Sequence, residues 1–128
     1  MRPSLWAGAV AVEDSRLLLV RGTVAPQAGR WSLPAVEVVA DEPLAAAVVR
    51  AGDQDAGVEA VCESLLGYVE DLAGEEHRVL LAFEVTVLTD DGLSPSATWV
   101  ELERVAELPL VAGLAELLIE RGILPLIG

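Results

Sequence analysis

Residues 34–58 read PAVEVVADEPLAAAVVRAGDQDAGV, and this stretch decides the fold. A turn at Asp41 leads through Pro43 into a run of Ala, Leu and Val. Asp41 is a suitable N-cap residue, and proline is tolerated in a first helical turn because its missing N–H would be unpaired there. We predict a helix over residues 42–56 that ends at Gly57, since glycine adopts a left-handed conformation at little cost. Helical spacing predicts its buried stripe: Leu44, Ala47, Val48 and Ala51.

The stretch resembles the signature of the Nudix hydrolases. That signature reads Gly, five residues, Glu, seven residues, Arg-Glu, an aliphatic residue, any residue, Glu-Glu, any residue, Gly and an aliphatic residue. Four of the nine specified positions match: Glu42, Arg50, Gly57 and Val58. The other five hold different residues: Val36, Ala51, Gly52, Gln54 and Asp55. Flanking segments also resemble this family: residues 7–22 its opening strand pair, 29–34 the strand before the signature, and 97–110 the late strand and turn.

The resemblance implies a metal site at positions 51, 54 and 55, which are neighbours on one side of a helix. Glutamates there would bind Mg²⁺ or Mn²⁺, which polarises a diphosphate linkage and lowers the pKa of an attacking water. Gln54 and Asp55 are the candidate metal ligands, whereas Ala51 offers none. The candidate catalytic residues carried over are Glu42, Arg50 and Asp55. Because the negative charge of the cluster falls from three to one, we expect metal-dependent hydrolysis to be absent or much reduced.

Several of these residues also have a purely structural interpretation. In Nudix enzymes the arginine helps to orient the catalytic carboxylates, but Arg50 could equally pair with Asp53, Asp55 or another nearby acid, and we favour this structural role. Glu42 could serve only as a first-turn acid that complements the helix dipole. Gly52 replaces an aliphatic residue and costs a helix about 0.5–1 kcal/mol relative to alanine. The helix is therefore not optimised around a metal site.

Candidates outside this stretch carry weaker signals. Carboxylates that could replace the lost ligands have no identifying spacing: Glu63, Glu70, Glu75, Glu76 and Glu84. Arginines that could hold an anionic ligand are not shown by the sequence to converge: Arg16, Arg21, Arg30 and Arg78. Trp31 is the best candidate for stacking on a base, although tryptophan at a strand position more often anchors a core. His77, the single histidine, is expected at a surface or strand end.

Composition limits the possible partners. The net charge is −13 and the chain contains no lysine, so its surface repels nucleic acid backbones and anionic membranes. We therefore expect neither a nucleic acid polymer nor a membrane as partner. A small phosphate-containing ligand remains possible, provided that a metal or arginines hold it. The single cysteine, Cys62, fits a reducing cytoplasm, and acids at 13–14 interrupt the first apolar run before a signal peptide is complete.

One domain over residues 1–128 is expected, with an α/β (α+β) fold arranged as a Nudix-like α/β/α sandwich around a mixed central sheet. The expected strands are 5–12 and 16–21, paired as a hairpin, followed by 31–39, 59–69, 77–88 and 98–102. A loop at 23–29, an acidic turn at 70–76 and a final helix at 110–121 complete the expected order.

Three functions from different classes follow. The chain could be an active hydrolase of a nucleoside diphosphate derivative that uses Asp55, Mg²⁺ or Mn²⁺, and carboxylates from elsewhere. It could instead be a binding module that has lost turnover and keeps a pocket for a small ligand. It could also be an interaction or structural protein, for example a homodimer. The replaced acids favour the second or third function, whereas the resemblance favours the first.

Overall fold

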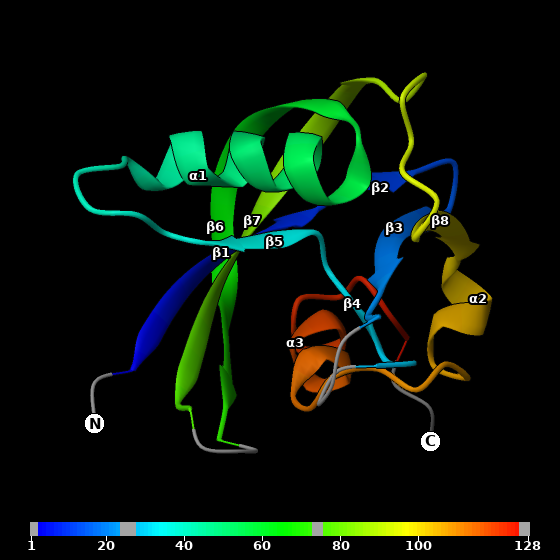
Figure 1. Cartoon of the computed structure of the whole chain (residues 1–128). Helices are drawn as coiled ribbons and strands as arrows, with labels where there is room; N and C mark the ends of the chain where they lie inside the picture. Colours follow the sequence, from blue (N-terminus) through cyan, green and yellow to red (C-terminus); the bar gives the residue numbers. More distant parts are fainter. Residues whose placement is uncertain (1–2, 24–27, 73–75, 126–128) are drawn as a thin grey trace.

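The computed structural model describes residues 3–23, 28–72 and 76–125. Of its two sheets, the one with the longer strands, called the larger sheet, is mixed (Figure 1). The strand order in this sheet is β5 (Ala35–Glu37), β1 (Ser4–Val10), β7 (Arg78–Thr89) and β6 (Glu59–Asp71). Strand β1 runs parallel to β7 and antiparallel to β5, and the long strands β6 and β7 are antiparallel. A smaller antiparallel sheet contains β2 (Val12–Glu13), β3 (Arg16–Arg21), β4 (Trp31–Ser32) and β8 (Ala97–Glu101).

Helices cover both faces of the larger sheet. Helix α1 (Leu44–Ala51) continues directly into the π-helical turn η1 (Gly52–Ala56) and packs on β1, β5 and β6. Helix α3 (Leu114–Glu120) lies on the opposite face, where its apolar residues join Val69 and Ala82 in one core cluster. The short helix α2 (Leu102–Val105) follows β8. The predicted mixed sheet between two helical layers is confirmed.

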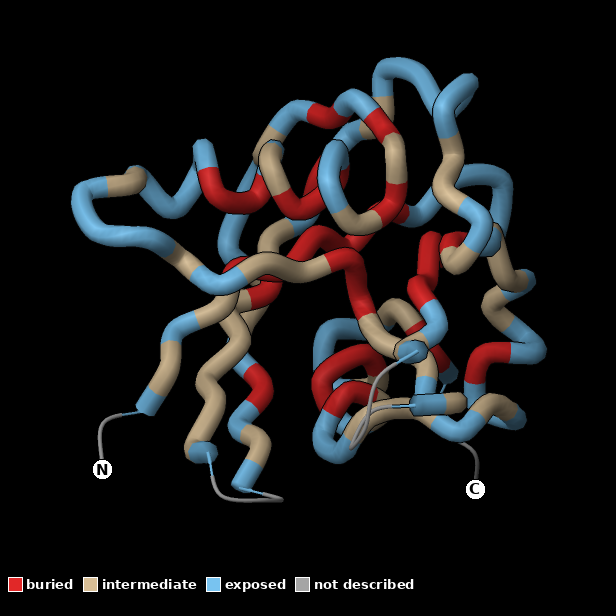
Figure 2. Tube along the Cα trace, in the orientation of Figure 1, coloured by how far each residue is buried: buried red, intermediate tan, exposed pale blue. Residues whose placement is uncertain are grey.

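Strand β3 connects the two halves of the core. Leu18 and Val20 belong to the cluster under α1, while Leu17 and Leu19 belong to the cluster under α3. All four are buried, so β3 is red over most of its length in Figure 2. A strand covered on both faces has an unbroken apolar run instead of an alternating pattern, which explains the sequence LLLV.

The expected strand boundaries need two corrections. Of the two strands before β3, β2 pairs with it and β1 does not, and the tight turn between β2 and β3 has φ of 50° at Asp14 and 61° at Ser15. Strand β1 joins the other sheet, so the expected hairpin of 5–12 with 16–21 is wrong for most of its length. The strand expected at 31–39, with Pro34 at a bend or edge, forms as two shorter strands, β4 and β5, on either side of Pro34, because proline has no N–H for a strand ladder.

The first helix also begins later than predicted. Asp41 has φ of 64° and provides no cap, and Pro43 occupies the N-cap position, so α1 starts at Leu44. Leu44 is 36% exposed, whereas the other three residues of the expected stripe are buried as predicted. Gly57 ends the helical segment with φ of 75°, which confirms its predicted role.

The C-terminal part follows the expected order with shifted boundaries. The last helix starts only at Leu114, because Gly113 has φ of 86°, and α2 was not predicted. The expected loop at 23–29 and the acidic turn at 70–76 lie partly outside the described residues. Among the described helices, none is long and apolar enough to cross a membrane.

Candidate ligand-binding site

Arg50 forms hydrogen bonds to residues on both sides of α1 in the sequence. Its Nε and Nη2 donate to the two carboxylate oxygens of Glu42 at 2.9 Å each, and Nη2 also donates to the carbonyl of Glu37 at 2.8 Å. Nη1 donates to Oε1 of Gln54 at 3.2 Å. Arg50 therefore joins the strand before the helix to the turn after it.

The ion pair of Arg50 is formed with Glu42, not with Asp53 or Asp55. Glu42 precedes the N-cap Pro43, so the interpretation of Glu42 as a first-turn acid is wrong. Its carboxylate also accepts from the N–H of Val39 at 3.3 Å. The hydrogen bond from Arg50 lowers the pKa of Glu42 and in turn raises the pKa of Arg50.

Asp55 connects η1 to two other segments. Its Oδ2 accepts from the N–H of Ala35 at 2.9 Å, and its backbone carbonyl accepts from Oγ of Ser94 at 3.0 Å. Burial raises the pKa of Asp55, and the hydrogen bond from Ala35 opposes that effect only in part. The side chain thus has a structural partner and a partly desolvated carboxylate.

A cavity of about 480 Å³ opens beside Asp55. Arg21 at the end of β3 and Arg78 at the start of β7 both line it, so two of the four candidate arginines converge on one space. Trp6 also lines the cavity, and the guanidinium of Arg78 lies 5.0 Å from the centre of its ring. Such cation–π contacts fix the position of an arginine against an aromatic face. The cavity therefore combines two arginines with two acids, Asp55 and Asp71.

The sequence identified some of these residues and missed the role of others. Trp31, our candidate for base stacking, packs against the core cluster under α3, and Trp6 occupies the cavity instead. Arg30 approaches the carbonyl of Leu110 at 3.5 Å, and Arg16 lines a separate shallow site near α2. Only the register between β1 and β7 brings Trp6 to Arg78, and no spacing in the sequence encodes it.

Comparison with known proteins gives one curated relative at modest coverage. The low-salt glycan biosynthesis protein Agl8 of Haloferax volcanii is 38% identical over 76 residues, and the match covers 53% of this chain and 48% of that protein. The chain therefore spans about half the length of this relative. No protein-family model matches the chain.

Solved structures match over nearly the whole chain. The MutT protein from Methanosarcina mazei Go1 superposes with a TM-score of 0.81 at 25% identity and covers 94% of both chains. The MutT Nudix hydrolase from Burkholderia pseudomallei superposes with a TM-score of 0.74 at 29% identity, covering 92% of this chain and 97% of that one. The chain has the Nudix fold. We use the name Nudix box for residues 36–58, the stretch whose sequence resembles the Nudix signature.

The Nudix fold implies a divalent metal ion. The Nudix box would have to provide the oxygen ligands for that ion. Ala51 has no donor and is fully buried, and the carbonyl oxygen of Gln54 already accepts from the cationic Arg50. Asp55 is the one remaining carboxylate at the three signature positions. Within residues 3–23, 28–72 and 76–125, no three acidic, histidine or cysteine side chains are grouped to hold a metal. The described residues of the Nudix box do not fit a Mg²⁺ site.

The other candidate carboxylates are engaged elsewhere or lie away from Asp55. Glu63 accepts from the hydroxyl of Thr86 at 3.0 Å. Glu70 contacts His77 at 2.7 Å, and Glu76 pairs with Arg78 at 3.4 Å. Glu84 lines a different cavity, and Glu75 lies outside the described residues. None of the described carboxylates in this set lines the cavity beside Asp55.

Proposed function

We propose that this protein belongs to the Nudix hydrolase family and binds a small phosphate-containing ligand in the cavity beside Asp55, with metal-dependent hydrolysis absent or much reduced. The main support for ligand binding is a pair of arginines. Arg21 and Arg78 line the cavity from two different strands. Guanidinium groups bind phosphate through forked hydrogen bonds, so this cavity can attract an anion without a metal.

The loss of turnover rests on the donor set of the Nudix box. A hydrolytic metal site needs several oxygen ligands and an open position for water. Here the three signature positions provide one carboxylate, and that carboxylate holds the N–H of Ala35. The remaining polar group, Gln54, is held by Arg50. The Nudix box therefore supports the fold through hydrogen bonds where a hydrolase would use it to bind metal.

Residual hydrolysis is the second candidate function, because Asp55 remains at the rim of a cavity on a fold shared with hydrolases. Its partly buried carboxylate would be the only acid of the signature cluster that could act on a bound diphosphate. This candidate predicts phosphate release that requires Mg²⁺ or Mn²⁺ and disappears in Asp55→Asn.

Calorimetric titration with ADP and with UDP-glucose separates the two candidates. UDP-glucose is a suitable probe because the curated relative is named for glycan biosynthesis. We expect saturable binding in the presence of EDTA that weakens about tenfold in Arg21→Gln and in Arg78→Gln, equal to about 1.4 kcal/mol. Arg104→Gln, which removes the same charge from an exposed site on α2, is the matched control.

Phosphate-release assays on both probes complete the test. Little release is expected with either Mg²⁺ or Mn²⁺. Robust metal-dependent release that Asp55→Asn abolishes would establish the hydrolase instead. Binding that requires a divalent ion and ignores both arginines would also overturn the proposal.

A further inference from the structure

A second cavity, of about 590 Å³, lies on the same face of the larger sheet as α3. It shares no lining residue with the cavity beside Asp55. Helix α3 separates the two, since Leu117 packs so closely on β6 that a Cβ at Gly67 would lie 2.8 Å from its Cδ1. Leu66 lines the second cavity and Val69 the first, on either side of this contact. The second cavity is therefore a site of its own.

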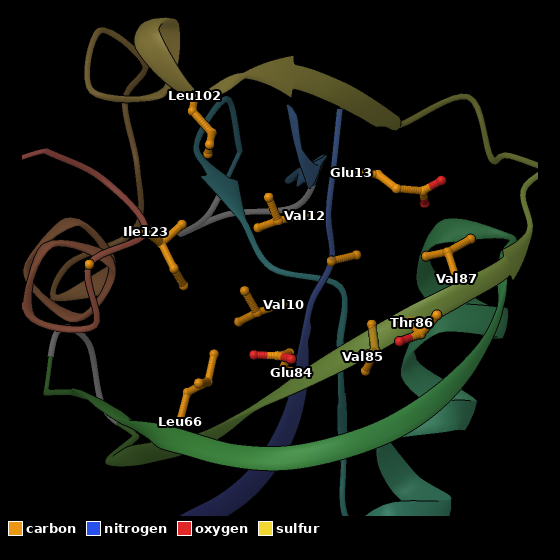
Figure 3. Close-up of a pocket in the computed structure, with 12 residues that line it drawn as sticks. Val10, Val12, Glu13, Leu66, Glu84, Val85, Thr86, Val87, Leu102 and Ile123 are labelled. Atoms are coloured by element: carbon orange, nitrogen blue, oxygen red, sulfur yellow. The ribbon is translucent and has the colours of Figure 1, made fainter. Parts of the chain in front are cut away.

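Part of its wall is apolar and comes from segments far apart in the chain. The apolar side chains that line it are Val10, Val12, Leu66, Val87, Leu102 and Ile123. Figure 3 shows Leu66 and Val10 across the cavity from Leu102 and Ile123. This enclosure favours a ligand with an apolar body of its own.

The charge in this cavity has one sign. Glu84 is exposed and lies beside Val10 and Leu66, and Glu13 is a further acid of the lining (Figure 3). Neither carboxylate has a hydrogen bond or ion pair to another described residue. Glu63 lies close by, bonded to Thr86 of the lining, and none of the described lining residues is basic. An anion would be repelled here.

We propose that this cavity binds a small organic cation, a primary ammonium on an apolar chain, whose head group pairs with Glu84. Apolar walls take the chain and the unpartnered carboxylate takes the charge. Charge complementarity supports this ligand, because the net charge of −13 attracts cations to the whole surface. The ligand has the opposite charge to the one proposed for the cavity beside Asp55, so the two sites are independent.

NMR titration of the full chain with n-hexylamine tests the proposal, with n-hexanol and hexanoate as probes of matched length. We expect saturable shifts at Val10, Thr86, Val87 and Ile123 with hexylammonium, weaker binding of hexanol, and no binding of hexanoate. Glu84→Gln should weaken hexylammonium binding about threefold to tenfold, in the range of a partly exposed ion pair. Glu116→Gln, on α3 and outside both cavities, should bind as the wild type does.

Charge reversal gives the sharpest result. Glu84→Lys should lose hexylammonium binding and gain binding of hexanoate at the same residues, and Glu84 is exposed, so the variant retains its fold. The proposal is overturned if hexylammonium gives no saturable shifts in the cavity. It is equally overturned if hexanol binds as tightly as the amine, or if Glu84→Gln and Glu116→Gln behave alike. None of these outcomes bears on Arg21, Arg78 or the binding of ADP.

Discussion

Arg50 and Glu42 form a two-point ion pair, with both nitrogen–oxygen distances at 2.9 Å. Its partners are separated by eight positions in the sequence, and it closes the loop before α1 onto the helix itself. The same arginine also holds Gln54 and the carbonyl of Glu37. The arginine and the glutamate at these two signature positions thus form a structural link within the Nudix box.

Glu42→Gln should lower the thermal stability of the protein near neutral pH. Arg50 lowers the pKa of Glu42 from its usual 4.5, so this carboxylate stabilises the fold above that value. Its contribution is lost as the pH falls through the lowered pKa. The difference in melting temperature between wild type and variant should therefore be present near pH 7 and vanish in acid. Glu59→Gln, an exposed carboxylate on β6, is the control, and an equal loss there would contradict the prediction.

Asp55 should show the opposite pH dependence. Burial raises its pKa from 3.8, so folding disfavours the ionised form of this carboxyl relative to the unfolded chain. That stabilising contribution is complete below the unfolded pKa and is lost as the pH rises through the folded pKa. Asp55→Asn, which can still accept from Ala35, should have a higher free energy of unfolding than wild type near neutral pH. Urea unfolding should show this gain shrinking in acid; a variant that is less stable at neutral pH would contradict it.

Two glycines of the Nudix box should respond in opposite directions to alanine. Gly57 has φ of 75°, and a Cβ there would overlap the carbonyl oxygen of Gly92, so Gly57→Ala should destabilise by about 2 kcal/mol or more.

Gly52 has helical φ and ψ, and its added Cβ would meet Val58 Cγ2 at 3.4 Å. Gly52→Ala should therefore stabilise by up to about 0.5–1 kcal/mol. Chemical unfolding of the two variants checks the sign of each change.

Restoring acids to the Nudix box should restore metal binding. Ala51→Glu combined with Gln54→Glu should raise affinity for Mn²⁺ by about tenfold or more, measured by calorimetry. The matched control, Ala45→Glu with Ala46→Glu, adds the same charge to exposed positions of α1. Because Ala51 is buried, circular dichroism must show that the first variant remains folded. A folded variant with no gain over the control would mean that these positions do not face a common site.

The order of the elements could be predicted from the sequence because each depends on local chemistry. Gly57 marks the end of the helical segment, Pro34 marks a break between strands, and the apolar runs at β6 and β7 mark strands. The predicted helix boundaries were wrong where a neighbouring residue changed the local backbone conformation. Asp41 adopts a left-handed conformation instead of capping the helix, and Gly113 delays the start of α3.

Strand pairing was beyond local prediction, since β1 pairs with β7, about 70 positions away, and leaves its expected hairpin partner. The candidate site shows the same limit. Glu42, Arg50 and Asp55 were identified by resemblance, but their hydrogen-bond partners were not predicted. The sequence also did not show that Arg21 and Arg78 line the same cavity. Those contacts arise from sheet register, which a linear pattern does not contain.

The sequence by itself determined the composition of the site: one carboxylate, one amide and one alanine where a metal cluster would need three acids. It also determined the negative charge and the layered fold, because apolar periodicity and turn residues act locally. Only the tertiary structure decided that Arg50 binds Glu42, that Asp55 holds Ala35, and that Arg21 and Arg78 line one cavity while Glu13 and Glu84 line another. The physical reason is that hydrogen bonds and cavities depend on distances in space. Those distances are set by the packing of the two sheets and α3.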